Sequence, residues 1–234
     1  MEMSTSNQCA RVARSGTWFA SLPDDLASRL LAEGRFLKLP AGTRLFARGD
    51  PPDGIYCVLN GVVRISTIAE NGKEVILAML VETQWFGEIA LFDGEPRTHD
   101  AWAEGECALL RVPQASLLRM LAERPAHWMD LGRLLTQKLR ITFAGLEEIA
   151  LLPPTARLAG RLTTMAGAYG TWTDRSKRVL EISQEQLGLM LSLSRQTVNQ
   201  SLKELEAGGS IRRNRGSIEI ADLEKLIKAK GSVG

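Results

Sequence analysis

Residues 183–209, SQEQLGLMLSLSRQTVNQSLKELEAGG, carry the clearest structural signal in the C-terminal part of the chain. Ser183, followed by a glutamine three residues later, forms a capping box and predicts the start of a short helix. A three-residue turn leads to Ser194, a second N-cap, and to a helix that we expect over residues 195–207. A glycine pair ends that helix. Two helices joined by so short a turn predict a helix-turn-helix.

A basic hairpin follows these helices. Residues 211–220 alternate between apolar and polar side chains around an Asn-Arg-Gly turn, which predicts a wing. In a winged helix-turn-helix the second helix enters the major groove, where arginine suits guanine, and glutamine and asparagine suit adenine. Arg212, Arg213 and Arg215 lie where a wing would meet phosphates. The candidate DNA-binding residues are Ser194, Arg195, Gln196, Thr197, Asn199, Gln200, Arg213 and Arg215. A winged helix that binds another protein is the alternative.

The charge of the chain is uneven. The whole chain holds 29 Lys and Arg against 27 Asp and Glu. Residues 154–234 hold 13 basic against 8 acidic residues, whereas residues 1–153 hold 16 against 19. A basic C-terminal third favours a polyanionic partner such as double-stranded DNA.

Composition argues against several classes of protein. No apolar run reaches the roughly 18 residues that a membrane-spanning helix needs, and the N-terminus lacks the features of a secretory signal. The three cysteines, Cys9, Cys57 and Cys107, lie far apart, which argues against a disulfide framework, structural zinc and a cysteine-ligated cluster. We therefore expect a cytoplasmic protein with reduced thiols, no metal and no membrane contact.

Turn residues punctuate the N-terminal half of the chain. Residues 1–21 show no sustained period and predict a flexible arm, and residues 24–33 predict a helix that a glycine closes. Beyond it, β-branched runs with alternating polarity are separated by Asn-Gly and similar turns. The runs are Ile55–Leu59, Val62–Ile68 and Glu74–Leu80. Short strands at this spacing predict a β-barrel or a β-sandwich.

After Pro125 the pattern becomes helical, until Pro153-Pro154 break the helix at a hinge. An apolar seam with 4-3-4-3 spacing consists of Leu135, Leu139, Thr142, Leu146 and Ile149. A second stripe, which would pack on the β-domain, consists of Leu131, Leu134 and Ile141. Two buried stripes fit a dimerisation helix, and an amphipathic helix in a monomer core is the alternative.

The C-terminal motif carries a family resemblance. Residues 182–207, and especially Ser194-Arg195-Gln196-Thr197-Val198, resemble the DNA-binding segment of the cyclic-AMP receptor protein and fumarate-nitrate regulator (CRP/FNR) family of bacterial transcription regulators. The resemblance covers roughly residues 20–222. It implies a homodimer that binds a palindromic operator. Gln196 and Gln200 stand where the best-known member has a glutamate and an arginine, so its operator does not carry over unchanged.

The same resemblance implies an α+β fold with three parts after the arm. These are a β-roll (a double-stranded β-helix) that binds cyclic nucleotides over residues 22–125, a long dimerisation helix over 126–152, and the winged helix-turn-helix over 153–234. In the family the loop that corresponds to residues 171–177 contacts RNA polymerase, which makes the polymerase an expected partner.

The sequence from Phe86 to Thr98 resembles the phosphate-binding cassette of cyclic-nucleotide-binding domains. An arginine can meet the cyclic phosphate bidentately, backbone N–H groups of a short helix start can add donors, and a carboxylate can accept from the ribose 2′-hydroxyl. In the family, a threonine on the long helix meets the purine. The expected ligand-binding residues are Gly87, Glu88, Ile89, Ala90, Arg97, Thr98, Thr142 and Phe143. Lys138 is a candidate partner for Glu88, and a solvated lysine is the alternative.

Cyclic AMP is the effector that the resemblance implies, and cyclic GMP is a second candidate. Thr98 directly follows the phosphate arginine, and a threonine there favours the guanine nucleotide in eukaryotic relatives. Three other functions remain open. They are a regulator of the same fold that senses another small ligand, a redox state or a gas; a nucleotide-binding scaffold that does not bind DNA; and an enzyme. We expect no enzyme, because the chain has two histidines and neither a nucleophile elbow nor a P-loop.

Overall fold

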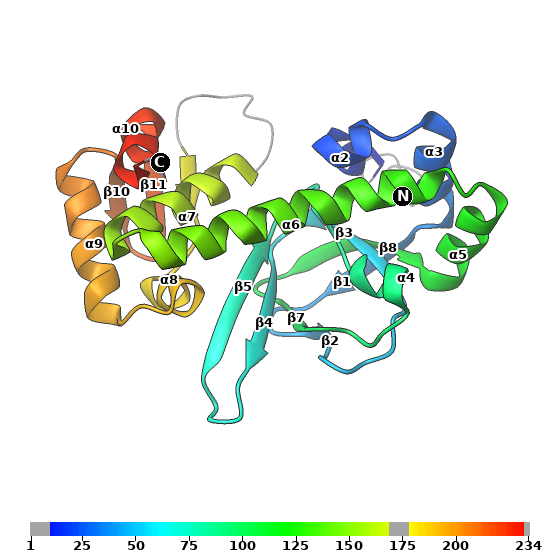
Figure 1. Ribbon diagram of the computed structural model, residues 1–234, viewed down its shortest axis with the longest axis horizontal. Coiled ribbons are helices and arrows are strands. Elements are labelled where there is room, and N and C mark those ends of the chain that lie inside the picture. The colour runs from blue at the N-terminus through cyan, green and yellow to red at the C-terminus, as the bar shows by residue number, and fades with distance from the viewer. Residues whose placement is uncertain (1–9, 169–177, 232–234) are drawn as a thin grey trace. The chain divides into compact units, whose positions relative to one another are not determined.

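The computed structural model describes residues 10–168 and 178–231. The chain divides into two compact units, of which the first comprises Met1–Thr67 and Leu77–Leu139, and the second Ile68–Ile76 and Arg140–Gly234. Helix α6 (His127–Leu151) is continuous from the first unit to the second (Figure 1). Among the described residues, no helix combines the length and the apolar character that crossing a bilayer requires.

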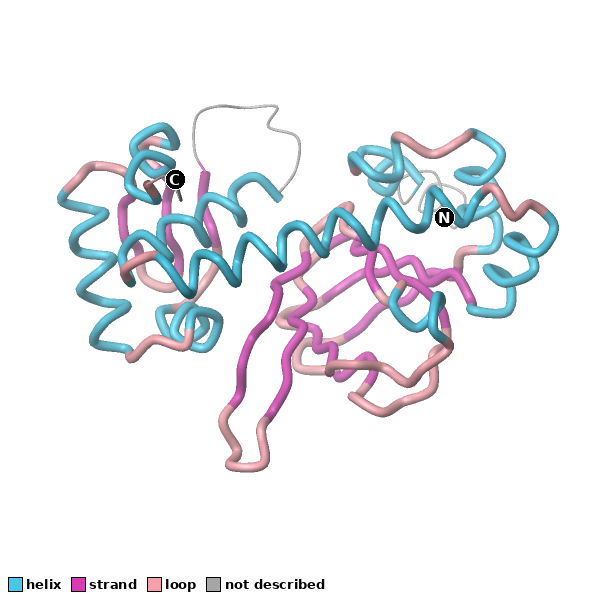
Figure 2. The backbone as a smooth tube through the Cα atoms, in the orientation of Figure 1, coloured by secondary structure: helices cyan, strands magenta, loops and turns pink. Residues whose placement is uncertain are grey.

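Two four-stranded sheets lie almost wholly in the first unit, with residues 68 and 74–76 of their strands counted in the second. Strands are magenta in Figure 2. One sheet has the order β1-β8-β3-β6, from β1 (Arg35–Leu39), β8 (Cys107–Pro113), β3 (Gly54–Asn60) and β6 (Trp85–Phe86). The other has the order β2-β7-β4-β5, from β2 (Arg44–Phe46), β7 (Asp100–Ala103), β4 (Val63–Ile68) and β5 (Glu74–Leu80). The three strands predicted from alternating runs are β3, β4 and β5, so these predictions are confirmed.

The core of the roll lies between the two sheets. Tyr56 and Phe86 from the first sheet share one buried cluster with Val63 and Ala101 from the second. The rings of Tyr56 and Phe86 stack with their centroids 5.3 Å apart. The predicted α+β fold with a β-roll is therefore confirmed.

Helices cover the outer face of the first sheet. They are α2 (Thr17–Ala20), α3 (Asp24–Glu33), α5 (Gln114–Glu123) and the start of α6, with the short α4 (Ile89–Asp93) after β6. Buried side chains from α3, α5, α6 and strands β3 and β8 form a second core cluster. The helix predicted over residues 24–33 is confirmed, whereas α5 was not predicted.

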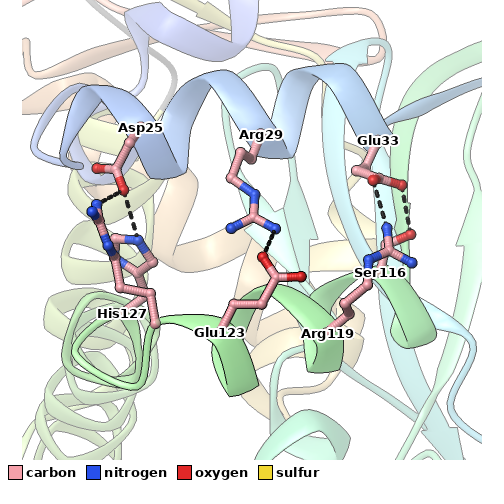
Figure 3. Close-up of polar contacts among 8 residues, drawn as sticks. Asp25, Arg29, Glu33, Ser116, Arg119, Glu123 and His127 are labelled. Carbon is pink, nitrogen blue, oxygen red and sulfur yellow. Dashed lines mark hydrogen bonds and ion pairs between the residues drawn. The ribbon is translucent and has the colours of Figure 1, made fainter.

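Ion pairs and hydrogen bonds join α3 to α5, to the residue that caps α5 and to the start of α6. Asp25 contacts Arg124 and His127, Arg29 pairs with Glu123, and Glu33 pairs with Arg119 and accepts a hydrogen bond from Ser116 (Figure 3). Most of these groups are exposed, so each surface pair contributes little to stability. The buried apolar residues between the helices provide most of the stabilisation, and the ion pairs set the register of α3 against α5.

The prediction of a flexible arm over residues 1–21 is wrong for its described part, residues 10–21. This segment is helical, and Trp18 is buried with its ring 5.5 Å from that of Trp85. The indole N–H of Trp18 also donates to the backbone carbonyl of Asp130 at 2.8 Å. The sequence showed no period here because the two helices are too short to reveal one, and tertiary contacts order them.

The second unit contains the winged helix-turn-helix. Its elements after α6 are α7 (Pro154–Ala168), β9 (Arg178–Leu180), α8 (Gln184–Leu191), α9 (Arg195–Ala207), β10 (Ile211–Asn214), β11 (Ser217–Ile220) and α10 (Leu223–Lys230). The capping box and the second N-cap form as predicted, because Ser183 accepts from the backbone N–H of Gln186 and Ser194 from that of Thr197. The predicted bounds of α9 are confirmed. Strand β9, which extends the wing to three strands, and helix α10 were not predicted.

The two apolar stripes of α6 differ in their burial. Leu131 and Leu134 are buried in the first unit, as predicted. Ile141 is 57% exposed, so its assignment to the buried stripe is wrong. Leu139, Leu146 and Ile149 of the predicted seam are also exposed.

Replacing Trp18 with alanine tests whether the N-terminal helices belong to the core. We expect Trp18→Ala to lower the free energy of unfolding by about 3–5 kcal/mol, because it removes a buried aromatic ring. Arg29→Ala, which removes an exposed ion pair, is the control and should cost less than about 1 kcal/mol. Urea unfolding measures the free energy of unfolding of both variants. A loss for Trp18→Ala as small as that of the control would contradict the packing of the N-terminal helices on the core.

Candidate functional site

Arg97 is a buried cation at the centre of the predicted cassette, with 4% of its surface exposed. Its Nη2 donates to Oδ1 of Asp53 at 2.6 Å and to the carbonyl of Gly54 at 2.7 Å, and its Nη1 donates to the carbonyl of Gly87 at 2.9 Å. The guanidinium carbon lies 4.4 Å from the centroid of the Phe46 ring. The side chain is therefore fixed in position by four groups from the roll.

One of the three nitrogens of this guanidinium makes no hydrogen bond to the described residues. Nε of Arg97 is buried and has no hydrogen-bond partner among the residues that the structure describes. A buried N–H without an acceptor is costly, and an anionic oxygen would satisfy it. The donor set at Arg97 therefore fits a phosphate.

Asp53 belongs to this site and was not predicted. Besides Arg97 it accepts from Tyr56 Oη and from Nη1 of Arg111, the latter at 3.1 Å. Burial raises the pKa of the Asp53 carboxyl, but the Tyr56 hydrogen bond and the charges of Arg97 and Arg111 together hold this pKa below its ordinary value. Two arginines facing one carboxylate leave a net positive charge, which favours an anion.

Glu88 is the second buried ionised group of the cassette. Nζ of Lys138, on α6, donates to Oε2 of Glu88 at 2.7 Å, so the predicted pairing of these residues is confirmed. Burial lowers the pKa of Lys138, whereas the charge of Glu88 and the hydrogen bond to it act in the opposite direction. The pair places a carboxylate, held by a residue of the long helix, directly after β6.

The remaining cassette residues surround Arg97 and Glu88 in the chain. Gly87 has φ of +91°, and a Cβ there would lie 2.8 Å from Nη1 of Arg97, so glycine lets the backbone carbonyl reach the guanidinium. Ile89 begins α4 and is exposed, whereas Ala90 is buried. Thr98 follows Arg97 and is exposed.

Thr142 and Phe143 lie on the part of α6 that belongs to the second unit. Phe143 is exposed. Their predicted contact with a purine therefore stays a prediction.

Helix α9 presents the predicted base-reading residues at its first turns. Val198, Leu202 and Leu205 are buried, and Arg195, Gln196 and Gln200 are exposed on the other side. Thr197 is bound to the N-cap, because its hydroxyl lies 2.8 Å from Oγ of Ser194. The helix thus buries one face and leaves the polar face of its N-terminal half accessible.

The wing carries its arginines in two different environments. Arg215 lies at the exposed turn between β10 and β11. Arg213, which we expected to meet a phosphate, is bound to Glu206 and Asn199 of α9. The loop of residues 171–177, which we expected to meet RNA polymerase, lies outside the described residues.

The stability of the first unit should depend on pH through Asp53. Because its folded pKa is lowered, its ionised form stabilises the fold above the unfolded pKa of about 4, and this contribution is lost as pH falls through the folded pKa. We expect Asp53→Asn to cost about 2 kcal/mol at pH 7, a figure discounted for the partial exposure of the carboxylate. Urea unfolding of both proteins should show this gap shrinking below about pH 4, and a gap that stays constant would contradict the assignment.

Comparisons with known protein families match both halves of the chain. A cyclic nucleotide-binding domain model matches residues 36–124, and a Crp-like helix-turn-helix domain model matches residues 156–229. A CRP-like cAMP-activated global transcriptional regulator of Mycobacterium tuberculosis is 30% identical over 93% of this chain and 97% of its own length. A cAMP-activated global transcriptional regulator CRP of Pasteurella multocida is 29% identical over 72% of this chain and 81% of its own.

Solved structures agree with these matches. A CRP/FNR family transcriptional regulator of Thermus thermophilus is 28% identical, with a TM-score of 0.69, over 86% of this chain and 100% of that one. FixK2 of Bradyrhizobium japonicum, at 18% identity, shares the fold with a TM-score of 0.77 over 86% of this chain and 99% of its own. With a relative that is 30% identical over nearly the whole of both sequences, the chain belongs to the CRP/FNR family of transcription regulators, with a cyclic-nucleotide-binding domain followed by a DNA-binding helix-turn-helix.

Proposed function

We propose that the chain is a cytoplasmic, homodimeric regulator that binds cyclic AMP in its first unit and then binds a palindromic DNA operator. The observation that carries the proposal is the buried guanidinium of Arg97, whose Nε has no partner among the described residues. The relatives whose names include activation by cAMP support this choice of effector.

The nucleotide would be held at both of its polar ends. Arg97 would donate to the cyclic phosphate, with Thr98 as a further donor, and Glu88 would accept from the ribose 2′-hydroxyl. Gly87 would let the backbone approach the ligand, beside Ile89 and Ala90 at the start of α4. Lys138 holds the Glu88 carboxylate in place, because it forms an ion pair with it.

The purine would meet the long helix at Thr142 and Phe143. Thr142 belongs to the apolar seam that we predict to form the dimer, so one nucleotide could contact both subunits. The exposed leucines and isoleucine of the seam support dimerisation, because a second α6 would remove them from water. RNA polymerase stays a proposed partner of the dimer.

Cyclic GMP is the second proposed ligand. The Thr98 hydroxyl can bond either the guanine amino group or the phosphate, so binding of cyclic GMP need not activate the protein. Calorimetric titration with each nucleotide shows whether the chain binds cyclic AMP, cyclic GMP or both. No binding of either at millimolar concentration would favour a regulator that senses another ligand.

On DNA, the first turns of α9 would read bases from the major groove. Arg195 would pair with guanine, and Gln196 and Gln200 would suit adenine, with Ser194, Thr197 and Asn199 beside them. Arg215 at the tip of the wing would meet a phosphate. The half-site would then be a TGT-like core followed by an A·T pair, with half-sites about one helical turn apart.

Replacing Arg97 with glutamine should lower the affinity for cyclic AMP by about 100-fold or more, because two charge-assisted hydrogen bonds are lost. Arg119→Gln is the control, since Arg119 forms an exposed ion pair with Glu33 and is not part of the cassette. Its affinity should stay within about fivefold of that of the unmodified chain. Calorimetry measures the affinity of all three proteins for cyclic AMP. Equal losses of affinity in the two variants would contradict the proposed phosphate site.

Replacing Gln196 with glutamate should change the base preference of the operator. A carboxylate accepts from the cytosine amino group, whereas an amide suits adenine, so Gln196→Glu should shift preference toward cytosine by about 1–3 kcal/mol. Site selection from random DNA in the presence of cyclic AMP measures the shift. Gln184→Glu, the same change on α8, should leave the preference unaltered. A strict cytosine requirement opposite Gln196 in the unmodified chain would refute this reading.

A further inference from the structure

A polar network centred on Arg213 joins the wing to helix α9. Nε of Arg213 donates to Oε2 of Glu206 at 2.7 Å, and its backbone N–H donates to Oε1 of the same carboxylate at 2.9 Å. Nη1 of Arg213 donates to Oδ1 of Asn199 at 3.2 Å. Because Glu206 and Asn199 belong to α9 and Arg213 to β10, these bonds fix the hairpin against the helix.

The charge of Arg213 is compensated within the protein. The backbone N–H and the side chain of Arg213 lower the pKa of Glu206, so this carboxylate is ionised at neutral pH. A phosphate beside Arg213 would meet a cation that is already paired. Arg215 differs, because it is exposed and has no carboxylate partner within the described part of the chain.

The bond from Arg213 also changes what Asn199 can offer to DNA. Asn199 lies one helical turn after Arg195, which places both on one side of α9. A carboxamide reads adenine by accepting from N6 with its oxygen and donating to N7 with its nitrogen. The bond from Arg213 takes one of the two lone pairs of Oδ1 and turns that oxygen toward the wing, so the amide presents mainly its two N–H donors to DNA.

We propose that Arg213 is a positioning residue for base recognition: with Glu206 it holds Asn199 as a hydrogen-bond donor toward DNA and does not itself bind a phosphate. A donor suits the O6 and N7 acceptors of guanine or the O4 of thymine. The inference rests on the proposed placement of α9 in the major groove.

Site selection from random DNA with four proteins tests the proposal. The base pair that Asn199 faces is identified as the operator position at which the Asn199→Ala variant prefers a different base from the unmodified chain. At that base pair, Arg213→Gln should shift the preference toward adenine by about fivefold or more, because the freed oxygen can accept from adenine N6. The double variant should have the same base preference as Asn199→Ala alone, since both substitutions act through the Asn199 side chain.

Salt dependence of binding to a fixed operator separates positioning from phosphate contact. Arg215→Gln, the same change on the same hairpin, should weaken binding to all sequences and reduce the slope of log K against log salt by about 0.9. Arg213→Gln should leave that slope unchanged. The proposal is overturned if Arg213→Gln lowers the slope without altering base preference, if Asn199→Ala alters no preference, or if the Arg213→Gln shift persists in the double variant.

The same measurements distinguish this inference from the proposed function. If the unmodified chain selected no site, both would fail. If it selected a site that Arg213→Gln bound with the original preference, only the role of Arg213 would fail.

Discussion

A buried arginine that must be hydrogen-bonded is the constraint on which the first unit depends. Burial of an unpaired guanidinium is too costly for a marginally stable domain, so Arg97 needs acceptors on several sides. The roll supplies the Asp53 carboxylate and two backbone carbonyls, those of Gly54 and Gly87. At Gly54, where φ is +144°, a Cβ would lie 2.1 Å from the carbonyl oxygen of Val112, so only glycine permits this close approach. The proposed anion site is thus built on a buried side chain of the roll.

Local signals explain why much of the fold could be predicted from the sequence. Cap residues placed α3, α8 and α9, because hydrogen bonds between residues three or four apart determine where a helix begins and ends. Alternating polarity around a tight turn placed the wing. Asp53 could not be predicted in the same way. Its partner Arg97 lies 44 positions away, and no local pattern shows which carboxylate a distant arginine will meet. Trp18 was missed for a related reason, since its role depends on contacts with Trp85 and Asp130.

In the second unit, too, some features could be predicted from residue types, whereas others depend on contacts that only the fold shows. Residue types at the start of α9 indicated base reading, and three arginines on the wing indicated phosphate contact. Charge alone does not distinguish an arginine that meets phosphate from one that meets a carboxylate of its own chain. Arg213 and Arg215 lie two positions apart, and the fold places only the first of them against Glu206. Their functions should differ accordingly, although their chemistry is identical.

In the proposed function, a nucleotide in the first unit controls DNA binding by the second. Fluorescence anisotropy of a selected, labelled operator with the unmodified chain tests it most directly, at fixed salt and with increasing cyclic AMP. We expect saturating cyclic AMP to raise operator affinity by about tenfold or more, as allosteric coupling between two sites commonly does. Equal affinity with and without the nucleotide, in a protein that calorimetry shows to bind it, would rule out this coupling.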